Sequence, residues 1–511
     1  MRSPVPSPAA GERAAPRRRP LLVWLCLFVF LLYLLSAGSN FASGDTLSEL
    51  RVSQSLVSHG GFDVPIVAAH TLCAGWGCRG LDGHYFASHG IGFSLFLLPF
   101  YGLAQAALAL VPAPRCVTWD SCVPIHLISW SNCLLGALTV ALLCVLCLDL
   151  GYPRRRALFL AILYGFGTLA WPYARFAFDV TPTALLLLAC FHQAVLGAAA
   201  SEGTRRWWSA GILAALAVLV RLPTIPALIP VALWAVLAPS DRPAIRWRRL
   251  AAFSLPVAVS LAFSGWYNLV RFGGILNDGH ATNAADRLLL HPWVGIVGMT
   301  ISPGKGLLWY SPTILFALVA LPRFYARHRA TARVALSMAL LSLVPYLFVP
   351  DWYGGDAWGP RFVLPVLPLL MLPAVECPPL LLATWRRRAA AAVVILWSLT
   401  MQVTGQLVSY PLRLRAAERA GISPTQLAWD PRHTPILDQL GTLITYIAHP
   451  SWAAMSTARA QSFDIWWLNL WRNDGLPRTP VLIAALVILA LALAAGSRLV
   501  REVRRPADLG P

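Results

Sequence analysis

Charged residues are scarce in this chain, and lysine is almost missing. Only 12% of its 511 residues are charged, and Lys305 is the one lysine among 41 basic residues, the others being arginine. The sequence contains no His/Cys spacing of a metal site, no Gly-x-Ser-x-Gly elbow, no nucleotide-binding pattern and no heptad run. We therefore expect no cofactor, and a divalent metal is not indicated, although the sequence does not exclude one.

The chain is instead rich in long apolar runs, since 57% of its residues are hydrophobic. A hydrocarbon core about 30 Å thick needs about 20 apolar residues per helix. In lipid, only helices and closed barrels satisfy the backbone polar groups. These runs are Leu/Ala/Val-rich and do not alternate with polar residues. The sequence thus predicts an all-α, polytopic integral membrane protein that contacts membrane lipids.

The arginines indicate the orientation. Although the net charge is +19, the arginines gather in short loops between apolar runs, which is the positive-inside pattern, so nucleic acid is not an expected partner. The clusters lie at residues 17–19, 154–156, 205–206, 242–249, 323–333, 386–388 and 498–505. Placing all of them in the cytoplasm gives about twelve spans with both termini inside. The predicted spans are near 20–37, 124–148, 156–172, 180–199, 207–221, 223–239, 250–270, 301–321, 334–350, 361–384, 389–409 and 480–497.

This topology divides the chain into four parts. Residues 1–19 form a basic cytoplasmic tail, and residues 20–409 form a transmembrane core whose first extracytoplasmic loop is 38–123. Residues 410–479 form an extracytoplasmic segment, and 480–511 hold the last helix and a second basic tail. No convincing cleavage site follows the first span, which we interpret as retained. We expect a multi-pass protein of the cell (inner or plasma) membrane.

One apolar segment, residues 90–111, does not fit this count, because a further crossing would place Arg154–Arg156 outside. Four cysteines lie in close pairs in the loops that flank it, which favours disulfides outside the membrane. They are Cys73, Cys78, Cys116 and Cys122. With both loops outside, the segment dips in and returns at Pro99 or lies along the outer surface. The alternative is an ordinary span with reduced thiols. The other six cysteines are interpreted as packing residues.

Two carboxylates follow the first span. Thr46-x-x-Glu49 has the form of a capping box, which predicts a helix that starts there and ends at Gly60-Gly61. The capping box is a sufficient structural explanation for Glu49. Asp45 lies just outside it and is either a helix-start residue or a catalytic carboxylate.

Further candidates lie at other outer helix ends. Arg175 and Asp179 are spaced to pair on a helix, or else Asp179 faces the same cavity as Asp45 and Arg175 lies near an anionic ligand. Arg221 departs from the inside bias of arginines, which makes it a functional candidate. Lys305, in Ser-Pro-Gly-Lys-Gly at the start of a span, suits a phosphate or else snorkels from a tight turn.

The loop DWYGGDAWGPRF at 351–362 is the densest polar feature. Asp351 and Asp356 are able to bind hydroxyl groups, and Arg361 to bind phosphate in bidentate fashion. The flat aromatic faces come from Trp352, Tyr353 and Trp358. An interfacial aromatic belt explains the tryptophans but not the Gly-Gly and the two aspartates. The mixture is what a sugar phosphate needs.

With these residues, the chain resembles the GT-C superfamily of polytopic glycosyltransferases, which includes protein O-mannosyltransferases and lipid A aminoarabinose transferases. SGDTLSEL matches the first outer loop with its acidic base, and DGHYFASHGIGFSLFLLPFY is similar to the segment that packs under it. YARFAFDVTPTALLLL places Asp179 as a second cavity carboxylate. ISPGKGLLWYSP and WYGGDAWGPRFVLPVLPLL are similar to segments that recur in such bacterial proteins. The family's Asp-Glu doublet is absent, because three residues separate Asp45 from Glu49.

The resemblance implies a hexosyl- or pentosyltransferase that acts on the extracytoplasmic face. Its donor is a polyprenyl-phosphate-linked sugar, and its acceptor is a hydroxyl of a lipid, glycan or protein. Asp45 is then the base of an inverting transfer, with Glu49 and Asp179 as further cavity carboxylates. The candidates for phosphate binding are Arg175, Arg221, Lys305 and Arg361, and those for sugar binding are Asp351, Trp352, Tyr353 and Asp356. The alternatives are a multi-pass transporter or lipid flippase, and a non-catalytic assembly partner.

Overall fold

The computed structural model describes most of the chain. The described residues are 8–38, 44–64, 79–81, 83–110, 123–200, 203–240, 242–279, 291–448, 463–472 and 477–505. The four cysteines of the predicted disulfides lie outside these ranges. Of the other six, Cys26 is half-buried and the rest are buried, all as free thiols, in agreement with a packing role.

Helices make up most of the described chain. Among the described residues, seven helices are long and apolar enough to cross a membrane. They are α1 (Pro8–Leu35), α5 (Val123–Asp149), α8 (Val180–Ala199), α11 (Pro243–Phe272), α15 (Arg329–Leu347), α18 (Trp385–Leu407) and α24 (Arg478–Arg504). In the same ranges the only sheet is a short antiparallel pair, in which β1 (Asp63–Val64) faces β2 (Tyr85–Phe86). The predicted polytopic α-helical fold is confirmed.

Three other predicted spans contain helices of fewer than 18 residues: α6 (Arg154–Gly167), α9 (Arg205–Val220) and α10 (Ile225–Leu237). Each overlaps its predicted range but is too short to count among the seven. The predicted single span at 301–321 is wrong, because the chain is broken after α12 (Pro292–Ile301) and again after α13 (Leu307–Tyr310), and α14 (Ile314–Arg327) begins only at Ile314. The number of about twelve spans therefore stays a prediction.

The predicted single span at 361–384 is wrong. This stretch is broken into η4 (Arg361–Val366), α16 (Leu367–Met371), η5 (Leu372–Glu376) and α17 (Pro378–Leu381). The cause is its prolines, which lack the N–H of the helical hydrogen bond and clash with the preceding turn. The pieces are nevertheless packed centrally, with Val366, Leu367 and Met371 fully buried.

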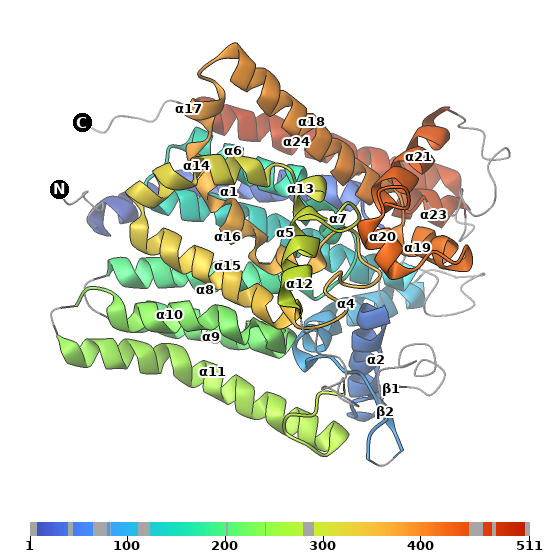
Figure 1. Ribbon diagram of the computed structural model, residues 1–511, viewed down its shortest axis with the longest axis horizontal. Helices are drawn as coiled ribbons and strands as arrows, with labels where there is room; N and C mark the ends of the chain where they lie inside the picture. Colours follow the sequence, from blue (N-terminus) through green and yellow to red (C-terminus); the bar gives the residue numbers. More distant parts are fainter. Residues whose placement is uncertain are drawn as a thin grey trace.

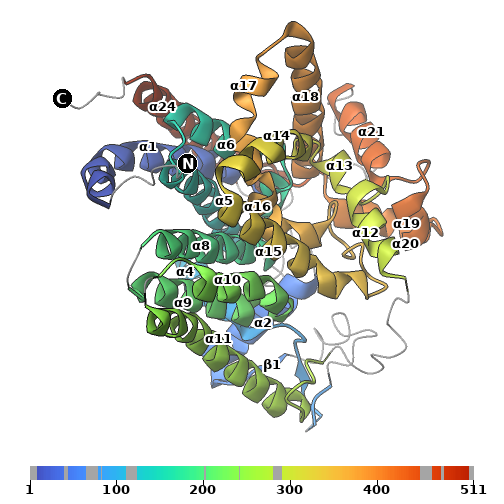
Figure 2. The same ribbon diagram turned by 60° about the vertical axis from the view of Figure 1, so that its left-hand side comes forward.

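The helices run roughly side by side, and both chain termini lie at one end of the bundle (Figure 1). The opposite end holds the β pair and a group of short elements: α2 (Gly44–His59), α19 (Tyr410–Arg419), α20 (Pro424–Trp429), α21 (Pro435–Ala448) and α23 (Trp466–Arg472). The first and last long helices, α1 and α24, lie against each other (Figure 2). Leu31 of α1 packs there with Ala492 and Ala495 of α24. Both ends of the sequence thus join one side of the bundle.

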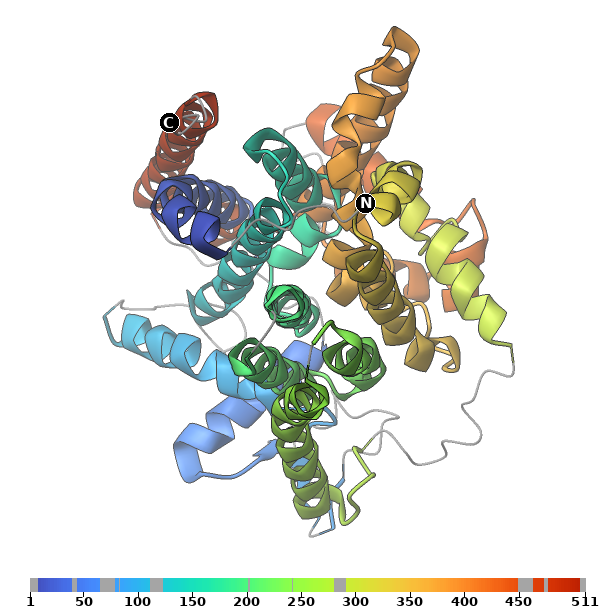
Figure 3. The ribbon, with the colours of Figure 1, turned by 90° about the vertical axis from the view of Figure 1, so that its left-hand side faces the viewer.

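The segment that did not fit the span count is α4 (Ile91–Leu110), one helix with Pro99 inside it. It contains no turn at Pro99, so it does not dip in and return. In Figure 3, where α8–α10 are seen nearly end-on in green, α2 and α4 run across the view in blue. Leu50 of α2 packs there with Phe93 and Leu97 of α4. An ordinary span and a position along the outer surface both stay predictions for this helix.

Candidate functional site

Helix α2 brings Asp45 to the end of the bundle opposite the termini. Asp45 lies in the first turn of α2, where a negative charge is favourable. The helix ends at His59 and is followed by Gly60 at φ 71°, as predicted. The predicted capping box is wrong, however. Thr46 lies inside the helix, and its hydroxyl donates to the carbonyl of Ala177 at 2.7 Å.

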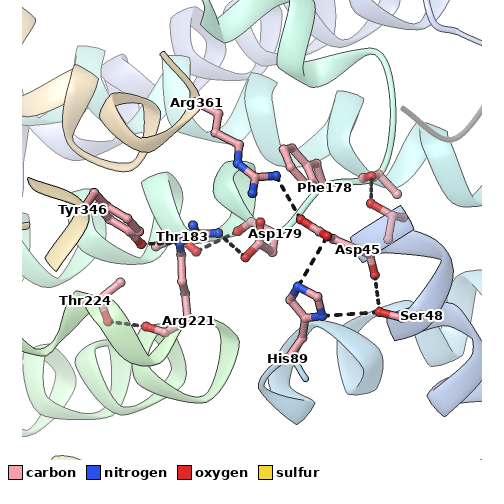
Figure 4. A network of polar contacts seen from close by, with 12 residues as sticks. Asp45, Ser48, His89, Phe178, Asp179, Thr183, Arg221, Thr224, Tyr346 and Arg361 are labelled. Atoms are coloured by element: carbon pink, nitrogen blue, oxygen red, sulfur yellow. Dashed lines mark hydrogen bonds and ion pairs between the residues drawn. The ribbon is translucent and has the colours of Figure 1, made fainter. Parts of the chain in front are cut away.

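Asp45 is paired with Arg361. The Arg361 Nη1 donates to Asp45 Oδ2 at 2.9 Å, and the Nε2 of His89 lies 3.7 Å from Asp45 Oδ1 (Figure 4). The Nδ1 of His89 lies 3.3 Å from the Ser48 hydroxyl. Burial raises the pKa of Asp45, but Arg361, His89 and Arg221 together lower it by more than burial raises it. The pKa of Asp45 therefore lies below its usual range. Asp45 is therefore ionised at neutral pH, the form that accepts a proton.

A second acid–arginine pair lies beside the first. Arg221 Nη1 donates to Asp179 Oδ2 at 2.5 Å, and Arg221 Nε donates to the Tyr346 hydroxyl at 2.8 Å. The guanidinium groups of Arg221 and Arg361 lie 5.5 and 5.0 Å from the centre of the Phe362 ring. Tyr346 stacks on that ring at 3.9 Å. Aromatic surface thus fixes both arginines next to each other.

The two pairs line one cavity of about 370 Å³. Its wall also includes His89, Arg271, Tyr346 and Asp351. Of the residues predicted from the sequence, the cavity brings together five: Asp45, Asp179, Arg221, Asp351 and Arg361. They come from α2, the start of α8, the end of α9, the 351–361 loop and the start of η4. A polar chamber with both signs of charge is thus built from segments far apart in the sequence.

Arg271 is a cavity residue that sequence reasoning missed. It is buried at the end of α11, and its hydrogen bonds go to the backbone carbonyls of Ala87, His89 and Tyr267 and to the Asn268 side chain at 2.8 Å. These acceptors are all uncharged. An arginine at an outer helix end was the signal that found Arg221, and the same rule applied to Arg271 would have found it.

His89 and Tyr346 were also missed. His89 lies just before α4, in a segment that the sequence assigned only to packing, and Tyr346 lies within the apolar run of α15. Neither position carries a local signal. Their contacts depend on Asp45 and Arg221, which are distant in the chain.

Lys305 does not line the cavity. Its side chain is buried, and Nζ donates to the carbonyl oxygens of Gly355 at 3.0 Å and Ala357 at 2.6 Å. It therefore holds the 351–361 loop from beneath. That loop turns through Gly354 and Gly355 at φ 76° and 57°, conformations that side chains rarely adopt. Lys305 supports the backbone that presents Asp351 and Arg361.

Three predicted sugar-binding residues belong to this loop but do not line the cavity. The Tyr353 hydroxyl donates to Asp351 Oδ1 at 2.8 Å and so orients that carboxylate. Trp352 is buried against Trp429, with ring centres 5.6 Å apart. Asp356 lies with Tyr410 at a separate, smaller pocket.

Arg175 is buried elsewhere. Its Nη2 donates to Asp464 Oδ2 at 2.8 Å, and its Nη1 donates to the carbonyl of Gly405 at 2.8 Å. The predicted pairing of Arg175 with Asp179 is therefore wrong, because each has a different partner. Arg175 instead ties the segment before α8 to the segment before α23.

Asp464→Asn is expected to lower the free energy of unfolding by about 3–5 kcal/mol, because it leaves the buried Arg175 charge without its counter-ion. Unfolding of the purified protein in detergent, followed by heat or denaturant titration, measures this loss. As a control, the double variant Arg175→Met/Asp464→Leu removes both charges and should lose less. A loss below about 1 kcal/mol in Asp464→Asn would contradict a structural role for the pair.

A second cavity of about 370 Å³ lies between α19, α20 and α21. An ion pair from Arg413 to Asp438 crosses it, and Arg432 and His433 lie on its wall. The turn that holds Lys305 contacts this region, since Gly304 N–H donates to the Ala428 carbonyl at 3.1 Å. The first part of segment 410–479, which was predicted to be extracytoplasmic, thus lines a cavity of its own.

Within the described ranges, no group of three or more His, Cys, Asp or Glu side chains is arranged to hold a metal ion. The chemistry available in the first cavity is that of carboxylates, arginines and one imidazole. Such a set transfers protons and stabilises anions.

Comparison with known proteins gives few matches. No family model matches the sequence, and no curated protein matches it. Among solved structures, the chain is similar to ArnT from Cupriavidus metallidurans in the apo state, with 15% identity, a TM-score of 0.46, and coverage of 97% of this chain and 78% of ArnT. The same protein bound to undecaprenyl phosphate gives 13% identity, a TM-score of 0.44, and coverage of 94% and 77%. At these TM-scores the likeness carries no conclusion about activity. The chain is a polytopic α-helical membrane protein, and it is similar to solved structures of ArnT.

Proposed function

We propose that the chain is a membrane glycosyltransferase that moves a sugar from a polyprenyl-phosphate donor to an acceptor hydroxyl, with inversion. The observation that supports this most is a single cavity in which the ionised Asp45 lies among three arginines. A transferase of this kind needs a base for the acceptor and cations for the leaving phosphate in one place.

The arginines supply the phosphate site. Arg361 and Arg221 already bind carboxylates, whereas among the described residues Arg271 donates only to uncharged oxygens. Arginine donors match phosphate oxygens bidentately, and such bonds strengthen as charge develops on the leaving group. Because the leaving polyprenyl phosphate is already an anion, the reaction needs no general acid.

Asp45 is the base. The pKa of Asp45 is held low by Arg361, so Asp45 is ionised but weakly basic. A donor phosphate that binds Arg361 competes with Asp45 for that cation, which raises the basicity of Asp45 once the donor is bound. Asp45 then takes the proton of the acceptor hydroxyl as its oxygen attacks the anomeric carbon from the face opposite the phosphate.

The remaining predicted residues support these roles. Asp351, oriented by Tyr353, is placed to bind sugar hydroxyls at the cavity wall, with Trp352 and Asp356 behind it. Lys305 and Arg175 hold the surrounding backbone. The second cavity, on segment 410–479, lies on the acceptor side. The positive-inside pattern of the arginines supports an extracytoplasmic site.

Purified protein in liposomes, given polyprenyl-phosphate-linked sugars of several kinds, should release polyprenyl phosphate from one of them and pass its sugar to an envelope acceptor. Mass spectrometry of cell-envelope glycans with and without the protein identifies the sugar and the acceptor. Unchanged glycans together with no release from any donor would exclude the proposal. Cysteine probes that reach the cavity from both sides of the membrane would favour a transporter or flippase instead.

A further inference from the structure

Glu49 is the least satisfied polar group near the cavity. Its side chain is 1% exposed, and neither carboxylate oxygen has a hydrogen-bond partner within the part of the chain that the structure describes. The capping-box explanation does not apply, because Glu49 lies in the second turn of α2. A buried carboxylate that is charged and unpartnered is very costly, so a group in this position either finds a counter-ion or keeps its proton.

The charged groups around Glu49 leave it no counter-ion. Asp45 precedes it by one turn on α2, and Asp179 faces it from the start of α8. The facing cations are Arg221 and Arg361, and Tyr267 faces it from α11. Each arginine is already engaged, Arg361 by Asp45 and Arg221 by Asp179. Burial, then Asp179 and Asp45, raises the pKa of Glu49 well above its ordinary value of 4.5.

We propose that Glu49 keeps its proton at neutral pH. The uncharged carboxyl is then a positioning residue, because Arg361 stays paired with Asp45 and Arg221 stays paired with Asp179. With Glu49 neutral, two carboxylates face two arginines. An ionised Glu49 would add a third negative charge, draw one arginine away from its aspartate, and repel a donor phosphate. The catalytic consequence rests on the proposed function, whereas the protonation itself does not.

Infrared difference spectra of the wild type and Glu49→Gln test the protonation directly. At neutral pH, the wild type should show the C=O stretch of a protonated carboxyl that Glu49→Gln lacks. Asp63→Asn is the matched control, since Asp63 contacts His59 away from the cavity and the band should persist there. If the wild type shows no band that Glu49→Gln removes, Glu49 is ionised and the inference is overturned, whether or not the protein transfers sugar.

The pH dependence of folding stability is a second test of whether Glu49 is protonated. The folded chain keeps the Glu49 proton and the unfolded chain loses it above about pH 4.5, so folding stability from this residue is full below that pH and falls as the pH rises. Glu49→Gln has no such proton to lose. Its stability relative to the wild type should therefore rise with pH between about 4.5 and neutrality. A difference that stays constant with pH would count against a retained proton.

The positioning role is read from the pH profile of sugar transfer. Above the Glu49 pKa, the wild type should lose activity by about tenfold per pH unit, and this limb should be absent in Glu49→Gln. A variant that shows the same alkaline limb as the wild type overturns the positioning role. If no enzyme form transfers any sugar, the proposed function fails while the infrared result still decides whether Glu49 is protonated.

Discussion

Asp45→Asn should slow sugar transfer by about a hundred- to ten-thousand-fold, the range over which a positioned general base contributes. The amide has the shape of the carboxylate and still accepts a hydrogen bond from Arg361, but it does not take the acceptor proton. Release of polyprenyl phosphate by purified protein in liposomes measures the loss. Binding of the donor should survive, because the arginines remain in place.

The matched control for this variant lies on β1, just after α2. Asp63 is half-exposed and contacts His59 at 2.8 Å, away from the cavity. Asp63→Asn should therefore transfer sugar at the wild-type rate. Near-normal turnover in Asp45→Asn, in protein that unfolds at the wild-type temperature, would remove Asp45 as the base.

Arg361→Gln should lower turnover by about a hundred- to a thousand-fold, since it removes one preorganised cation from the leaving phosphate. It also removes the main group that lowers the Asp45 pKa. That pKa should therefore rise, and the acid side of the pH–rate profile should move to higher pH. Kinetics across pH, together with polyprenyl phosphate binding, separate the two effects.

Arg333→Gln is the control for a generic loss of positive charge. Arg333 is exposed on α15 and contacts Tyr325, outside the cavity. It should leave donor binding and the pH profile unchanged. If Arg361→Gln bound polyprenyl phosphate as tightly as the wild type and kept its pH profile, the arginine would have no part in the phosphate site.

The sequence predicted which residues share one end of the molecule but not how they pair. Arginine clusters and outer helix ends were enough to place Asp45, Asp179, Arg221 and Arg361 together, and the cavity contains all four. The local spacing of Arg175 and Asp179 was misleading. Asp179 pairs with Arg221, 42 positions away, because Arg175 turns toward Asp464, 289 positions away. A choice between partners depends on packing, which short-range spacing does not encode.

The predicted helices were also correct in one place and wrong in another. The length of the apolar run predicted α8 at 180–199 with its observed bounds, because the polar residues at both ends of the run mark where the helix starts and stops. The same criterion failed at 361–384, where the prolines decide the backbone and composition alone does not. The capping box failed because α2 begins at Gly44, so Thr46 lies inside the helix, where its hydroxyl donates to the distant carbonyl of Ala177.

The buried Lys305 offers a practical probe of motion. It is the only lysine of the chain, and its amine lies beneath the 351–361 loop, bound to Gly355 and Ala357. An amine-reactive reagent added to the folded protein therefore has no exposed lysine to modify. Acylation of Lys305 requires the loop to move away from the amine. The acylation rate, measured by mass spectrometry, therefore reports the rate of loop opening without any engineered label.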